Sequence, residues 1–221
     1  MSGSVDNGDD YTAQREQMVR QQIEERGIHD PVVLAAMRAV PREQFVLEPH
    51  RRFAYDDTPL PIPANQTISQ PYIVAYMIAA LHLRPADRVL EIGAGSGYAA
   101  AVLSHIVAAV YTVERHRGLA DFARERLARL GYDNVYVRHA DGTRGWPEHA
   151  PYDGIVVAAG GPAVPESLRE QLAVGGRLVM PVGRSRGRQH LVRHTRRAAA
   201  DYREESLVPV AFVPLIGDEG W

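Results

Sequence analysis

Three segments in the first part of the chain carry apolar residues at the spacing of one helix face, which predicts amphipathic helices. They are residues 15–26, 32–40 and 73–81. The second segment follows Asp30-Pro31, a favourable N-cap and first-turn pair. Between the second and third segments, residues 45–71 contain five prolines and predict a long irregular loop. Such a loop in a compact domain is usually functional or disordered, and its continuation into a helix suggests that it is held in place.

From residue 87 onward, short apolar runs alternate with helix-competent segments. The expected strands are residues 88–92, 109–113, 135–139, 154–158 and 176–181, and the expected helices are residues 98–107, 117–130 and 166–172. This alternation predicts a parallel sheet with helices on both faces. Residues 189–195 and 205–213 are more alternating and less apolar, which predicts an antiparallel edge. The predicted fold is α/β: a doubly wound, mostly parallel Rossmann-like sheet with antiparallel C-terminal edge strands and an N-terminal helical extension.

The chain of 221 residues is long enough for one domain with a small appendage, and its hydrophobic content of 45% can fill a core. Residues 1–12 are acidic and small and are expected to be a disordered tail. We assign residues 13–86 to a helical and loop extension and residues 87–221 to a cofactor-binding domain. The two N-terminal helices are expected to cover this domain and leave it monomeric.

Charge and composition exclude several classes of function. A net charge of −2 argues against a broad surface for nucleic acid or anionic membranes, so neither is expected as a partner. The absence of cysteine excludes disulfides, zinc-thiolate sites and cysteine nucleophiles. The N-terminus has neither a basic start nor an apolar run, so no secretory signal is predicted and a cytoplasmic protein is expected. The nine histidines show no metal-ligand spacing, and no metal is predicted.

A glycine-rich loop joins the first predicted strand of the α/β region to its helix. Gly93, Gly95 and Gly97 are spaced two apart and follow Glu91. Glycine permits a tight turn and a close approach of a ligand to the backbone. Doubly wound folds bind nucleotide-like cofactors at this position. The G-x-G-x-G spacing differs from the dinucleotide fingerprint G-x-G-x-x-G and resembles the first motif of S-adenosylmethionine-dependent methyltransferases.

Acidic residues stand at the ends of successive predicted strands. Glu91 and Glu114 close the first two, Asp141-Gly142 follows the third, and Asp153 opens the fourth. A carboxylate such as that of Glu114 can accept both hydroxyls of a ribose, and Asp141-Gly142 is placed to meet an adenine edge. Taken singly, each acid is more often solvated, a helix N-cap or part of a turn. An acidic ribose contact also suits a nicotinamide enzyme, and the glycine spacing is the main argument against that reading.

Just before this domain, Ser69 and Pro71 are suited to the start of the helix at residues 73–81. Thr67 and Ser69 would face the cofactor if this helix packs over the glycine loop. The segment Gln66-Thr67-Ile68-Ser69-Gln70-Pro71-Tyr72 together with the glycine loop closely resembles the protein-L-isoaspartate (D-aspartate) O-methyltransferase family. Further matching motifs are Val40-Pro41-Arg42-Glu43, Val113-Glu114-Arg115, Asp141-Gly142, Gly175-Gly176-Arg177-Leu178 and Phe212-Val213-Pro214-Leu215. The resemblance covers roughly residues 14–216 in the same order.

The resemblance implies an enzyme that transfers a methyl group from S-adenosyl-L-methionine to the free α-carboxylate of an isoaspartyl residue in a damaged protein or peptide. The ester then cyclises to a succinimide that reopens partly to aspartate, and S-adenosyl-L-homocysteine is the other product. The resemblance makes Ser69 the active-site hydroxyl, and Thr67 and Ile68 the lining of the methyl-transfer site. The cofactor contacts that it implies are Ile68, Glu91, Gly93, Gly95, Gly97, Glu114, Asp141 and Gly142. The segment that it implies for holding the substrate peptide is Val213, Pro214 and Leu215.

Two segments depart from the family's usual pattern: residues 62–66, where many members carry glycines, and residues 158–162, which include Gly160-Gly161. Both bear on substrate preference more than on cofactor use. One alternative is therefore a related carboxylate O-methyltransferase that acts on a specific peptide precursor. Another is a non-catalytic S-adenosylmethionine-binding protein, against which the intact Thr67-Ile68-Ser69 segment argues.

Overall fold

The computed structural model describes residues 8–185 and 188–221, and a seven-stranded sheet forms its centre. The strands are β3 (Arg88–Ile92), β4 (Ala109–Glu114), β5 (Val135–His139), β6 (Tyr152–Val157), β7 (Leu172–Ser185), β8 (Arg188–Ala198) and β9 (Asp201–Val210). Their order in the sheet is β5-β4-β3-β6-β7-β8-β9. The pairs among β3 to β7 are parallel, whereas β8 and β9 pair antiparallel. The predicted α/β fold with an antiparallel C-terminal edge is confirmed.

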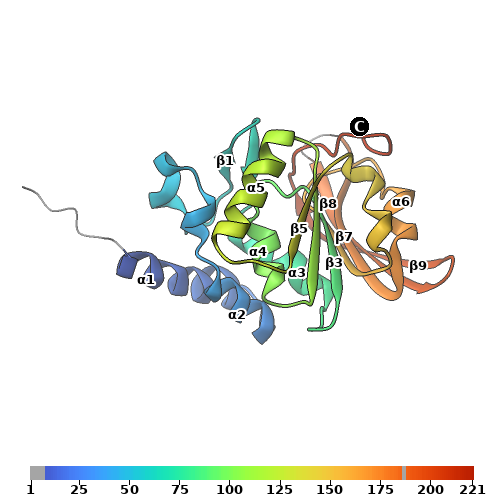
Figure 1. Ribbon diagram of the computed structural model, residues 1–221. Helices are drawn as coiled ribbons and strands as arrows, with labels where there is room; N and C mark the ends of the chain where they lie inside the picture. The colour runs from blue at the N-terminus through green and yellow to red at the C-terminus, as the bar shows by residue number, and fades with distance from the viewer. Residues whose placement is uncertain (1–7, 186–187) are drawn as a thin grey trace, which may run out of the picture.

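Helices cover both faces of this sheet, as the alternation along the chain predicted (Figure 1). On one face lie α3 (Pro71–Leu81), α4 (Tyr98–Ser104) and α5 (Arg117–Arg129), and on the other lies the short α6 (Glu166–Glu170). The two faces bury separate apolar clusters, because successive side chains of a strand point to opposite faces. In β3, for example, Val89 belongs to one cluster and Leu90 to the other.

The N-terminal extension contains α1 (Gly8–Met18), a π-helical segment over Val19–Glu24 and α2 (Pro31–Ala39). Asp30 caps α2 as predicted, since its carboxylate accepts the backbone N–H of Val32 at 2.9 Å. Helix α1 begins at Gly8, so residues 8–12 of the expected disordered tail are helical. Residues 1–7 of that tail lie outside the described residues.

The proline-rich stretch is more ordered than the expected irregular loop. It contains 3-10 helices at Arg42–Phe45 (η2) and Glu48–Phe53, followed by a hairpin of β1 (Leu60–Ile62) and β2 (Gln66–Ile68). Ala64 and Asn65 turn the hairpin with φ of 60° and 55°. The sequence contains no Asn-Gly or Asp-Gly pair there, which is the usual signal for such a turn.

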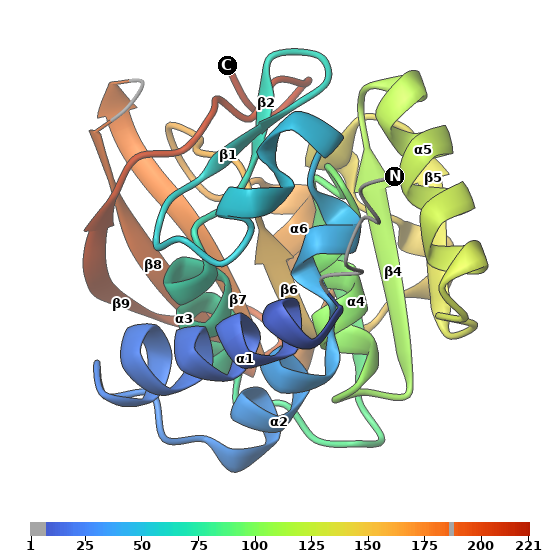
Figure 2. The ribbon, with the colours of Figure 1, turned by 90° about the vertical axis from the view of Figure 1, so that its left-hand side faces the viewer.

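The hairpin lies at the end of the molecule where the C-terminus also lies (Figure 2). Ile62 reaches the glycine loop, since a Cβ built on Gly95 would stand 3.3 Å from the Ile62 side chain. The hairpin thus covers the ligand-binding end of the sheet. Within the part of the chain that the structure describes, no helix is long and apolar enough to cross a membrane.

Candidate active site

The turn from β3 into α4 places three glycines in the left-handed region of backbone conformation. Gly93, Gly95 and Gly97 have φ of +94°, +53° and +89°, which a side chain would strain. The turn is fixed to the neighbouring strand, because the Gly93 N–H donates to the Val113 carbonyl at 2.8 Å. The sequence motif therefore forms the close-approach loop that was predicted.

A cavity of about 600 Å³ opens above this loop at the carboxyl ends of the strands. Its lining combines the glycine loop with β2, the start of α3, the ends of β4 and β6, and the segment after β9. The sequence-predicted site residues among the lining are Thr67, Ile68, Ser69, Glu91, Gly93, Gly95, Glu114, Gly142, Val213, Pro214 and Leu215. Gly97 and Asp141 do not line it. Segments that are far apart in the chain thus meet around one space.

Two buried carboxylates lie beneath the loop. Glu114 accepts the N–H of Gly95 at 3.0 Å with one oxygen and the N–H of His116 at 2.9 Å with the other. Each carboxylate oxygen can accept a further hydrogen bond, which suits a ligand diol. Glu91 is 1% exposed and accepts the Thr112 hydroxyl at 2.5 Å. Burial, with a smaller contribution from the charge of Glu114, raises the pKa of Glu91 to about 8 against the hydrogen bond from Thr112.

Burial changes from residue to residue along the end of β2 and the residue that follows it. Ile68 is buried in the core beside the cavity, whereas Thr67 is exposed and Ser69 is half-buried. Among the described residues, no hydrogen-bond partner of the Ser69 hydroxyl is found, so the group is available to a ligand. Ser69 and the glycine loop therefore border the same cavity.

The Asp141 carboxylate accepts three hydrogen bonds from within the chain. One carboxylate oxygen accepts the Thr143 N–H at 2.9 Å and the Thr143 hydroxyl at 2.8 Å, and the other accepts the N–H of Asp218 at 2.9 Å. Gly142 does line the cavity, and it must be glycine because a Cβ there would stand 2.5 Å from Ile92. Asp141 therefore ties this turn to Thr143 and to the backbone of Asp218. Asp153 anchors a strand start, since it accepts the Arg88 N–H at 2.8 Å.

The segment Val213-Pro214-Leu215 is held against the end of β6 by Gly160. The Gly160 N–H donates to the Val213 carbonyl and the Leu215 N–H donates to the Gly160 carbonyl, both at 2.8 Å. The buried Gln189 accepts the N–H of Phe212 at 2.9 Å and so fixes the start of this segment. Sequence reasoning missed Gln189, because nothing local distinguishes it from other residues of an edge strand.

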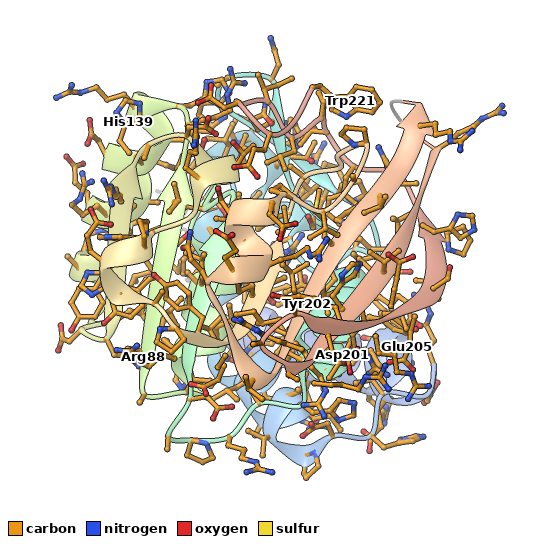
Figure 3. All side chains as sticks on the ribbon, turned by 90° about the vertical axis from the view of Figure 1, so that its right-hand side faces the viewer. Arg88, His139, Asp201, Tyr202, Glu205 and Trp221 are labelled. Atoms are coloured by element: carbon orange, nitrogen blue, oxygen red, sulfur yellow. The ribbon has the colours of Figure 1, made fainter. Side chains whose placement is uncertain are left out.

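The C-terminal residues also belong to this end of the molecule. Trp221 lies at the same end of the sheet as His139, the last residue of β5, and far from Arg88, the first residue of β3 (Figure 3). Its indole N–H donates to the Gly160 carbonyl at 3.0 Å. Over residues 8–185 and 188–221, no group of three or more histidine, aspartate or glutamate side chains is arranged to hold a metal ion.

Comparisons with known proteins agree with this geometry. A family model described as protein-L-isoaspartate(D-aspartate) O-methyltransferase matches residues 13–220. Protein-L-isoaspartate O-methyltransferase 1 of Rhodopseudomonas palustris (strain HaA2) is 63% identical over 98% of this chain and 88% of its own length. Protein-L-isoaspartate O-methyltransferase 2 of Pelobacter propionicus is 64% identical over 94% of this chain and 92% of its own length.

Solved structures give the same relationship. A protein-L-isoaspartate O-methyltransferase superposes with a TM-score of 0.84 at 30% identity and covers 93% of this chain and 67% of its own. A structure from Plasmodium falciparum, described as a protein-L-isoaspartate O-methyltransferase in complex with S-adenosyl-L-homocysteine, has a TM-score of 0.78 at 27% identity. That match covers 91% of this chain and 98% of the other. This chain therefore belongs to the protein-L-isoaspartate(D-aspartate) O-methyltransferase family.

Proposed function

We propose that this protein is a protein-L-isoaspartate O-methyltransferase, which methylates the free α-carboxylate of L-isoaspartyl residues in damaged proteins and thereby initiates their repair. The observation that carries the proposal is the cavity itself. It joins the Ser69 hydroxyl, the glycine loop and the segment at Val213–Leu215. Ser69 and Val213 are 144 positions apart in the sequence. Membership of the family supports the same activity, as does 63% sequence identity to a curated member over 98% of this chain.

The cavity suits S-adenosyl-L-methionine, which is the methyl donor of this family. We assign the ribose hydroxyls to Glu114, whose two oxygens already accept two backbone N–H groups and keep further lone pairs. The adenine is assigned to the turn at Asp141 and Gly142, which the hydrogen bonds of Asp141 to Thr143 and Asp218 hold in place. The backbone of Gly93, Gly95 and Gly97, with Ile68 and Glu91, would hold the remainder.

When bound, S-adenosyl-L-methionine supplies a methyl group whose bond to sulfur breaks as a bond to a carboxylate oxygen forms, leaving S-adenosyl-L-homocysteine. An α-carboxyl group has a pKa of about 3.5, so the nucleophile is ionised at neutral pH and needs no general base. The protein's task is therefore orientation and removal of water. We assign the Ser69 hydroxyl to one oxygen of the substrate carboxylate, which leaves the other oxygen free to react. Thr67, the exposed middle residue of β2, and the segment Val213, Pro214 and Leu215 would hold the peptide.

The proposal is tested with radiolabelled S-adenosyl-L-methionine and two short peptides, one with a single isoaspartyl residue and one with aspartate in its place. Base-labile label on the isoaspartyl peptide alone is the expected result. Label on neither peptide, with cofactor binding intact, would contradict the proposal. In that case the search would move to another carboxylate substrate or to a role without catalysis.

Two finer points belong to the same proposal. Acceptance of D-aspartyl residues is inferred from the family's name alone, and a third peptide with D-aspartate would test it. A monomer is inferred from the N-terminal helices, which pack on the sheet domain through a shared apolar cluster.

A further inference from the structure

A fully buried arginine stands behind the active-site segment. Arg42, in η2, has 0% of its surface exposed, and burial lowers the pKa of its guanidinium. Among the described residues, no carboxylate lies within ion-pair distance of it. Removing an unpaired charge from water costs several kcal/mol, so the surrounding groups must compensate for the burial of Arg42.

Two backbone carbonyls and one aromatic ring compensate for part of that cost, while the buried Nη1 has no hydrogen-bond partner among the described residues. The Nε–H of Arg42 donates to the Ala54 carbonyl at 2.8 Å, and an Nη2–H donates to the Ser69 carbonyl at 2.8 Å. The guanidinium carbon lies 4.7 Å from the centre of the Tyr98 ring, a cation–π geometry. Tyr98 is the first residue of α4, directly after the glycine loop. One side chain therefore contacts both the Ser69 backbone and the helix that follows the cofactor loop.

Ser69 needs an anchor of this kind. The hairpin ladder of β1 and β2 ends at Ile68, so Ser69 lies beyond the last pair of that two-stranded sheet. It also precedes α3, which starts at Pro71. A peptide unit between two elements is free to tilt unless something holds its carbonyl, and its tilt decides where the hydroxyl points.

We propose that Arg42 is a positioning residue for methyl transfer: by holding the Ser69 carbonyl against Tyr98, it fixes the direction of the Ser69 hydroxyl relative to the glycine loop. The inference rests on the proposed function. It assigns a role to the motif Val40-Pro41-Arg42-Glu43, which lies outside the cavity lining. Arg42 touches neither reactant in this scheme, so it acts through Ser69.

The test compares Arg42→Met and Arg42→Lys with a matched control, Arg88→Met. Arg88 also donates to two backbone carbonyls, those of His149 at 2.7 Å and Pro151 at 2.9 Å, but it lies at the opposite end of the sheet. Misplacing a reacting group by about 1 Å can cost 100-fold in rate. For Arg42→Met we therefore expect kcat on an isoaspartyl peptide to fall roughly ten- to hundredfold per folded molecule, with the Kd for S-adenosyl-L-homocysteine changed less than about twofold.

Arg42→Lys keeps the charge but loses the fork that reaches both carbonyls, so an intermediate kcat is expected. If Arg42→Met does not fold, Arg42→Lys takes its place in the comparison of kcat and Kd. A further readout is chemical rescue: guanidinium ion at low millimolar concentration should restore part of the kcat of Arg42→Ala, whereas urea at the same concentration should not. A purely structural role would lower the melting temperature without these effects.

The inference is overturned if folded Arg42→Met or Arg42→Lys retains wild-type kcat, or if the Kd for S-adenosyl-L-homocysteine rises as much as kcat falls. Arg88→Met should keep wild-type kcat, whatever its stability; an equal loss there would also contradict a role specific to Arg42. An inactive wild-type protein would instead count against the proposed function. The two failures are thus distinguishable.

Discussion

The Ser69 hydroxyl is the side-chain donor that the proposed mechanism places on the substrate carboxylate. A hydrogen bond to a charged group contributes about 1.5–3 kcal/mol, which corresponds to a rate factor of about 10 to 150. We expect Ser69→Ala to lower kcat on the isoaspartyl peptide by that factor while leaving S-adenosyl-L-homocysteine affinity unchanged. The control is Ser206→Ala, since Ser206 is exposed on β9 and lies outside the cavity lining. Unchanged turnover of Ser69→Ala would refute its role.

Glu91 gives the protein a pH-dependent stability. Its folded-state pKa is raised to about 8 by burial, above the ordinary value of 4.5. Because the carboxyl pKa is higher in the folded protein, the unfolded chain releases this proton at a lower pH than the folded protein does. The free energy of unfolding therefore contains the full contribution of the protonated form below pH 4.5. That contribution is lost as the pH rises to about 8. Glu91→Gln, which stays neutral, should therefore lose less thermal stability than wild type between about pH 5 and pH 8.

Melting temperatures of the ligand-free proteins across that pH range check this prediction. Glu125→Gln is the matched control, because Glu125 is exposed on α5. Parallel curves for wild type and Glu91→Gln would show that Glu91 is ionised in the folded protein.

For single residues, the sequence predicted the place of a side chain in the fold better than its hydrogen-bond partners. Glu91 and Glu114 lie near the carboxyl ends of β3 and β4, and Gly142 follows β5. Such strand ends meet at one edge of a parallel sheet, so the arrival of these residues at one cavity could be predicted. The hydrogen bonds of Asp141 could not be predicted, because one of its oxygens accepts the N–H of Asp218, which lies 77 residues further along the chain. Arg42 was visible as part of a motif, but its bond to Ser69 depends on a fold that brings residues 27 positions apart together.

Among the elements, α5 supports the glycine loop from behind. Arg126 of α5 is buried, and its Nη1 donates to the Ser96 carbonyl in that loop at 3.1 Å. The same group lies 3.4 Å from the Phe45 carbonyl in η2, and the guanidinium stacks on Phe122 at 3.9 Å. Burial lowers its pKa to about 10, so it is charged at neutral pH. The loop therefore has a fixed cationic anchor.

Arg126→Met should loosen the glycine loop while leaving the Ser69 segment in place. We expect the Kd for S-adenosyl-L-homocysteine to rise about 10-fold, as the loss of a charged hydrogen bond of about 1.5 kcal/mol implies. Calorimetric titration checks this, with Arg129→Met, an exposed neighbour on the same helix, as the control. Unchanged affinity in a folded Arg126→Met protein would exclude the anchoring role.

Element boundaries were predictable where local pattern and tertiary pairing agree. β3 and β5 begin and end where the apolar runs do. β7 extends from Leu172 to Ser185, well beyond the predicted residues 176–181, because it pairs with β6 on one side and with β8 on the other. The β1–β2 hairpin escaped prediction since its turn places Ala64 at positive φ, which alanine seldom adopts.

For the molecule as a whole, the regular alternation after residue 87 was enough to predict the layered architecture. It did not predict how the preceding segment joins it. A single buried cluster includes Met37 of α2, Ile78 of α3, Val89 of β3 and Leu191 of β8. The assigned boundary at residue 86 therefore crosses a continuous core, and the extension and the sheet are expected to unfold together.

That expectation gives a prediction for the whole chain. A ligand at 100 times its Kd stabilises the folded state by about 2.7 kcal/mol, which raises the melting temperature of a protein of this size by roughly 5–11 °C. S-adenosyl-L-homocysteine should shift a single transition by that amount. Far-ultraviolet circular dichroism follows all helices, including α1 and α2, whereas tryptophan fluorescence follows Trp146 and Trp221, which both lie after residue 86. The two midpoints should coincide with and without ligand, because binding at the glycine loop stabilises the core that both segments share. Two transitions, with the ligand moving the fluorescence midpoint alone, would instead mean that residues 13–86 fold independently of the cofactor domain.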